Sequence, residues 1–100
     1  MEDLFLTIKN DELVKVDRYG NGRGLICRNA RCGMFSHDMK KVVVVRNDGI
    51  VQIHDFHGNP LQRICEDGLD ARFSGEDIIV QRKNGRTELR DKYGNTKRTM

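Results

Sequence analysis

A five-residue pattern occurs three times in this chain, as Asp17-Arg18-Tyr19-Gly20-Asn21, Asp55-Phe56-His57-Gly58-Asn59 and Asp91-Lys92-Tyr93-Gly94-Asn95. The Asp residues are separated by 38 and then by 36 positions. A fixed period of about 20–50 residues is typical of an array of one supersecondary unit. Asp accepts backbone N–H bonds, and Gly and Asn tolerate a left-handed backbone, so each copy of the pattern predicts a tight turn.

Short apolar runs surround each of these turns. A second turn, formed by Asn10-Asp11, Asn47-Asp48-Gly49 or Asn84-Gly85, precedes each Asp, and such dipeptides between apolar runs indicate hairpins. The runs are rich in β-branched and aromatic residues, which is typical of strands. They cover residues 4–8, 13–16 and 24–27 in the first copy, 42–45, 50–53 and 61–65 in the second, and 78–80, 87–89 and 96–100 in the third.

The segments that join the copies also repeat. Phe35-Ser36 recurs 38 positions later as Phe73-Ser74, and apolar residues alternate with polar ones over 69–74, which predicts a fourth strand with one buried face. We therefore expect Phe35 and Phe73 to be equivalent buried anchors. In the first copy the apolar residues Val14 and Val16 fall out of step with the other copies, through either a bulge or a different exposure.

These observations predict an all-β fold in a single domain of residues 1–100. We expect three blade-like antiparallel β-sheet repeats of about 36–38 residues, over about 4–29, 30–68 and 69–100. The first repeat is expected to lack its first strand, because three residues precede Leu4. The units could form a partial propeller, a prism or an irregular barrel.

The second and third units resemble WD-repeat blades. The shared order is a strand that ends in Phe-Ser, an apolar strand, a turn such as Asp48-Gly49, a strand that ends in an x-Asp dipeptide, and a Gly turn before an outer strand. The signature Trp is replaced by Val16, His54 and Arg90. The resemblance implies blade-like sheets, although propellers close with about four to eight blades, so two chains could pair to provide six.

Composition restricts the class of protein and its surroundings. Charged residues make up 33% of the chain and the net charge is +3, which by itself does not indicate a nucleic-acid partner. The three Cys residues form an odd set without an export signal, which favours reduced thiols and a cytoplasmic location. No stretch is apolar enough to span a membrane.

Two residue sets are candidate binding sites. The turns could supply carboxylates and rings to a glycan, one site per unit, although the turn itself explains the same residues: Asp17, Tyr19, Asp55, His57, Asp91 and Tyr93. The third unit offers a basic surface for nucleic acid, which solvated strand faces would also explain: Arg82, Lys83, Arg86, Arg90, Lys97 and Arg98.

Catalytic and metal chemistry has little support in the sequence. Ser36 and Ser74 lie outside any Gly-x-Ser-x-Gly elbow. Cys27 and Cys32 have a spacing that resembles a zinc site, but such a site needs four ligands of fixed type, and the equivalent strand positions of Cys27 and Cys65 indicate small core residues. We therefore expect no enzyme, no catalytic residues, no metal and no cofactor. The leading hypothesis is a protein-binding or scaffold module that forms homo-oligomers. A carbohydrate-binding lectin assembled as a propeller is the alternative, and nucleic-acid binding through the basic unit is less favoured.

Overall fold

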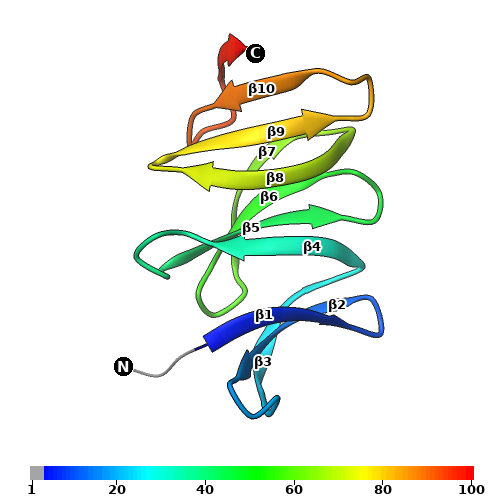
Figure 1. Cartoon of the computed structure of the whole chain (residues 1–100), viewed down its shortest axis with the longest axis vertical. Coiled ribbons are helices and arrows are strands. Elements are labelled where there is room, and N and C mark those ends of the chain that lie inside the picture. Colours follow the sequence, from blue (N-terminus) through cyan, green and yellow to red (C-terminus); the bar gives the residue numbers. More distant parts are fainter. Residues whose placement is uncertain (1–3) are drawn as a thin grey trace.

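The computed structural model describes residues 4–100, and these residues form strands and turns without a helix (Figure 1). They build three antiparallel sheets, which confirms the predicted all-β fold with blade-like repeats. The first sheet contains β1 (Leu4–Lys9), β2 (Glu12–Asp17) and β3 (Gly22–Arg28). The second contains β4 (Ala30–Phe35), β5 (Lys41–Arg46), β6 (Val51–Asp55) and β7 (Pro60–Cys65). The third contains β8 (Gly68–Ser74), β9 (Asp77–Arg82), β10 (Thr87–Arg90) and β11 (Thr96–Thr99).

The sheets are stacked one after another along the longest dimension of the molecule (Figure 1). The described chain measures 39 × 27 × 19 Å, and the leading strands β4 and β8 of the second and third sheets contact one another. Each sheet contacts its neighbour in sequence, but the described strands form no closed barrel. The stack therefore has two ends, one at the first sheet and one at the third.

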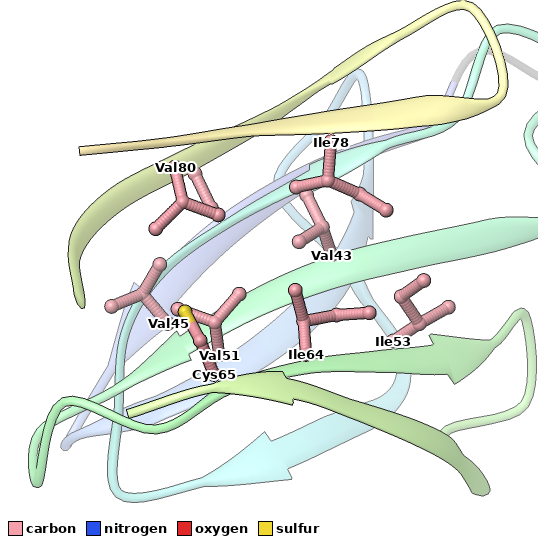
Figure 2. Packing of buried hydrophobic residues seen from close by; sticks show 9 residues of the cluster. Val43, Val45, Val51, Ile53, Ile64, Cys65, Ile78 and Val80 are labelled. Atoms are coloured by element: carbon pink, nitrogen blue, oxygen red, sulfur yellow. The ribbon is translucent and has the colours of Figure 1, made fainter. Parts of the chain in front are cut away.

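The core lies in the two junctions between sheets. Val42 and Val44 of β5 pack toward the first sheet, whereas Val43 and Val45 pack toward the third, and all four are fully buried. Successive side chains of a strand point to opposite faces, so a strand covered on both faces becomes a continuous apolar run. Figure 2 shows the second junction, where Ile78 and Val80 of the third sheet cover β5, β6 and β7.

Register explains the apparent mismatch in the first copy. Each sheet has a bulge at the same place, next to Lys15/Val16, Ile53/His54 and Leu89/Arg90. Lys15 thus takes the place of Ile53 and Leu89 and is itself buried. Strand β2 therefore has the same orientation as β6 and β10, and the buried Lys15 replaces the apolar residue that the other two copies carry at this position.

Phe35 and Phe73 occupy matching places, as the 38-residue offset predicts. Phe35 pairs with Val42 and packs on the first junction, while Phe73 pairs with Ile78 and packs on the second. The prediction that both are buried is wrong, because each ring is only partly covered. The reason is that each ring lies at the end of its strand, where the neighbouring sheet covers one side of it.

Candidate functional site

The three Asp-x-x-Gly-Asn turns have one common geometry. Oδ1 of Asp55 accepts the backbone N–H of His57 at 2.8 Å and that of Asn59 at 2.9 Å. The equivalent bonds of Asp17 measure 2.9 and 3.0 Å, and both bonds of Asp91 measure 2.9 Å. In each turn the Asn side chain also donates to Oδ2 of the Asp, at 3.0 to 3.4 Å. The repeated Asp is therefore explained by the turn that it holds.

The turn bonds make all three carboxyl groups more acidic. The Asn59 side chain and then its backbone N–H hold the pKa of Asp55 below the usual value, and the backbone N–H of Asn95 does most for Asp91. Burial opposes ionisation of Asp17, but bonds from Asn21, Tyr19 and Arg23 outweigh it and lower its pKa as well. A carboxylate stabilised in this way binds protons more weakly in the folded state than in the unfolded chain.

We expect the free energy of unfolding to decrease when the pH falls below about 4, the ordinary range of Asp. The unfolded chain then takes up protons first, so the stabilisation is complete above that range and is lost as the pH falls through the lower folded pKa values. Urea unfolding between pH 7 and pH 2 measures this. An Asp55→Asn variant should show a shallower pH dependence, and a constant free energy across this range would contradict the assignment.

Two of the turns also attach each sheet to the one before it. Gly58 and Gly94 both have a φ of 91°, as the turn predicts. A Cβ atom on Gly58 would lie 2.5 Å from the carbonyl oxygen of Leu25 in β3, and one on Gly94 would lie 2.9 Å from that of Ile64 in β7. Gly20 has a similar φ of 82°, but a Cβ there would meet nothing within 4 Å. The turn of the first sheet is therefore not engaged in a junction.

The ring residues of the candidate glycan set point into solvent. Tyr19 is 75% exposed, Tyr93 is 63% exposed, and His57 is exposed as well. Their carboxylate partners Asp17, Asp55 and Asp91 are engaged by the turn bonds described above. Each ring also contacts the residue before it in its turn, namely Arg18, Phe56 or Lys92. The structure thus places exposed rings beside carboxylates that already have donors.

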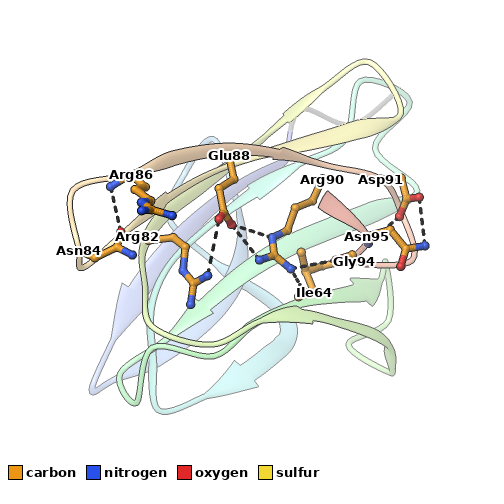
Figure 3. A network of polar contacts seen from close by, with 9 residues as sticks. All are labelled: Ile64, Arg82, Asn84, Arg86, Glu88, Arg90, Asp91, Gly94 and Asn95. Atoms are coloured by element: carbon orange, nitrogen blue, oxygen red, sulfur yellow. Dashed lines mark hydrogen bonds and ion pairs between the residues drawn. The ribbon is translucent and has the colours of Figure 1, made fainter. Parts of the chain in front are cut away.

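Three of the six basic residues predicted as one surface of the third sheet are paired with carboxylates. Arg82 and Arg90 flank the buried carboxylate of Glu88, at 3.6 and 2.8 Å (Figure 3). Lys97 pairs with Asp77 at 2.8 Å. Arg90 also donates to the carbonyl oxygens of Ile64 and Gly94 and so connects the third sheet to the second. The remaining members of the predicted set are exposed: Lys83, Arg86 and Arg98.

The Glu88–Arg90 pair has counterparts of different chemistry in the other sheets. By register the same two places hold Gln52 and His54 in β6, whose side chains are 3.1 Å apart. In β2 they hold Val14 and Val16. Burial alone would raise the pKa of Glu88, but the hydrogen bonds and charges of Arg90 and Arg82 outweigh it and lower that pKa. The polar pairs face a preceding sheet, whereas the apolar pair lies on the outer side of the first sheet.

A cluster of side chains at the first junction differs from its counterpart at the second. The Lys15 ammonium lies 3.8 Å from the centre of the Phe56 ring and donates to the Phe56 carbonyl oxygen, and Phe56 stacks on Phe35 at 6.2 Å. Burial lowers the pKa of Lys15, and the Asp55 charge opposes this. At the second junction the equivalent residues are Ile53, Lys92 and Phe73, and these line a cavity of about 380 Å³.

Sequence reasoning missed several of these residues. Lys15, Phe56 and Lys92 lie in or next to the repeated motif, and their types vary between copies, so the pattern did not single them out. Glu88 stands among basic residues in the sequence, and nothing in that order indicates that it is buried. A position-by-position comparison of the three copies could have found them, because each replaces an apolar residue by a charge or the reverse.

No metal site or membrane span is found within residues 4–100. These residues contain no group of three or more His, Cys, Asp and Glu side chains that could hold a metal ion. Cys27, Cys32 and Cys65 are unpaired, and burial raises the pKa of each thiol. The described residues also include no long apolar helix of the kind that crosses a bilayer.

No protein-family model matches this sequence, and no curated protein is significantly similar to it. The blade-like character of the chain therefore rests on its own three sheets.

Proposed function

We propose that this chain is a non-enzymatic scaffold module of WD-like blades that self-associates head to tail, with the first sheet of one copy docked on the third sheet of another. The observation that carries the proposal is the exposure, at the ends of the stack, of positions that are buried at both internal junctions. Edges and faces of this kind are common sites of association.

The first sheet supplies one half of a junction. Phe5 pairs with Val16, just as Val42 pairs with His54 and Ile78 with Arg90. Val42 and Ile78 are 0% exposed, whereas Phe5 is 53% exposed. The neighbouring places on this face hold the apolar pair of β2 rather than a polar one, and a Cβ atom on Gly20 would meet nothing within 4 Å. The outer face of the first sheet is thus suited to apolar contact.

The third sheet supplies the other half. Ile79 pairs with Leu89 as Val43 pairs with Ile53 in the second sheet, and the latter two residues are buried. Ile79 and Leu89 are only partly covered. Met100 takes the place of Ile64 in the repeat and is 60% exposed, compared with 4% for Ile64. This face repeats the surface on which the second sheet receives the third.

The exposed faces of the first and third sheets are complementary, because equivalent faces already pack together at the two internal junctions. At each internal junction a turn glycine lies against the outer strand of the preceding sheet. A copy could therefore place Gly20 against Thr99 and Met100 of another copy. Such a contact is heterologous, and it closes only if the rotation allows. Two copies of three sheets would provide six, within the range of about four to eight in propellers.

Light scattering on variants with one blocked end tests this proposal. We expect the wild-type chain to be larger than a monomer at high micromolar concentration. Phe5→Lys blocks the head and Leu89→Lys blocks the tail, so each variant alone should be monomeric. A mixture of the two should regain a dimer, because one variant keeps a good tail and the other keeps a good head.

Leu69→Lys is the matched control for these variants. Leu69 is exposed on β8 and takes the place of Arg31 in the repeat, so a charge is tolerated there and association should be unchanged. A strictly monomeric wild type would overturn the proposal. So would a mixture of the two variants that remains monomeric, since a head-to-tail contact requires only one intact head and one intact tail.

The other expected functions have less support. A glycan site at the turns would use Tyr19, His57 and Tyr93, but the adjacent carboxylates are already bonded within the turns. Nucleic acid would meet Lys83 and Arg86 in the β9–β10 turn and Arg98 on β11, and neither segment carries an aromatic side chain. The three unpaired thiols are consistent with the cytoplasmic location that forms part of this proposal.

A further inference from the structure

We propose that the cavity at the second junction binds a small molecule made of a flat aromatic ring and a carboxylate group. The cavity has a volume of about 380 Å³ and lies between the second and third sheets. Pockets for small ligands have volumes of about 300–1,000 Å³. The proposal concerns a junction inside one chain, so it does not depend on self-association.

The repeat shows what the cavity lacks. At the first junction the ring of Phe56 stacks on Phe35, with ring centres 6.2 Å apart. At the second junction Phe73 takes the place of Phe35, but Lys92 takes the place of Phe56. Phe73 thus has no aromatic partner at the second junction. The ring of a ligand can stack on Phe73 in the position that Phe56 takes on Phe35.

An aliphatic side chain, Ile53, lines the cavity where the first junction has a lysine. At the first junction a lysine, Lys15, lies over the Phe56 ring. At the second junction the place of Lys15 is taken by Ile53, which is buried and lines the cavity beside Phe73. A ring bound here would therefore contact an aliphatic side chain on one side and an aromatic ring on another.

Two lysines determine the charge of the ligand. Lys41 and Lys92 line the cavity and also a second hollow of about 250 Å³, which contains Leu61, Gln62 and Tyr93 as well. Carboxylates line only the larger cavity: Asp38, which accepts the hydroxyl of Ser36 at 2.6 Å and the N–H of Lys40 at 3.0 Å, and Glu76 in the β8–β9 turn. A ring on Phe73 would thus place its anionic group toward the smaller hollow, which both lysines line and no carboxylate lines.

Titration with 2-naphthoate, followed by ¹H–¹⁵N NMR, tests the proposal. We expect saturable shifts at Ile53, Phe73 and Lys92. Lys92→Phe supplies the side chain that the second sheet carries at this place, so it should fill the cavity and abolish saturable binding. Lys92→Gln, and the neutral analogue 2-naphthamide with the wild type, should each weaken binding about tenfold through loss of one charge-assisted contact.

Arg18→Phe is the matched control, because Arg18 holds the same place in the first turn, away from this junction. It should leave the affinity for 2-naphthoate unchanged. Wild-type protein without saturable binding at millimolar ligand would overturn the proposal, and so would undiminished binding to Lys92→Phe. Equal affinity for 2-naphthamide would overturn the assignment of an anionic ligand. If Lys92→Phe fails to fold, Lys92→Gln and the neutral analogue still decide the outcome.

Discussion

Replacing Gly58 by valine is expected to destabilise the protein by about 2–5 kcal/mol. Gly58 has a φ of 91°, which strains any residue with a Cβ atom, and that atom would lie 2.5 Å from the backbone carbonyl oxygen of Leu25. Backbone cannot move aside as a flexible side chain can. A chain of 100 residues has a total stability of about 5–15 kcal/mol, so the variant should unfold at a much lower urea concentration.

Gly20→Val separates the two causes of this loss. Gly20 holds the equivalent place in the turn of the first sheet, with a similar φ of 82°, but a Cβ there would meet nothing within 4 Å. The Gly20→Val variant should lose only the stability that backbone strain at this positive φ costs, about 1–3 kcal/mol. Equal losses for the two variants, measured by urea unfolding, would show that the turns do not attach one sheet to the next. The comparison is best made at low protein concentration, where the proposed self-association does not engage Gly20.

Replacing Glu88 by valine is expected to cost about 3–5 kcal/mol, the usual effect of removing one partner from a buried ion pair. Glu88 is buried and lies between the guanidinium groups of Arg82 and Arg90. Without the carboxylate both cations would remain partly buried and uncompensated. Guanidinium or urea unfolding of the variant and the wild type at pH 7 measures the loss.

The double variant Glu88→Val/Arg90→Val should be less destabilised than Glu88→Val alone. Val14 and Val16 occupy the same places in the first sheet, so the strand geometry accepts an apolar pair. A cost of about 1–3 kcal/mol should remain, because the carbonyl oxygens of Ile64 and Gly94 lose the Arg90 donor and Arg82 still lacks its carboxylate. If the losses of the two single variants simply add, Glu88 and Arg90 are not coupled, which contradicts this view of the network.

The repeat predicted much of the fold because turn chemistry is local. Asp55, Gly58 and Asn59 specify their turn through bonds among themselves, so reading three such patterns was enough to place three sheets. The same locality limited the prediction of the site. The pattern at Asp17, Asp55 and Asp91 favoured a turn but also allowed a ligand site, and the bonds within the turn show how the carboxylates are used.

The strands, the turns, the positive φ at Gly58 and Gly94 and the equivalence of Phe35 with Phe73 follow from the order of residues alone, since each depends on neighbours along the chain. Which faces of the sheets meet depends on how the three sheets pack. This packing placed Lys15 inside a junction, left Phe73 half covered beside a cavity, and buried Glu88 between two arginines. Burial and pairing of these side chains depend on the sheet that packs against them, and the sequence of one repeat does not specify the side chains of that neighbouring sheet.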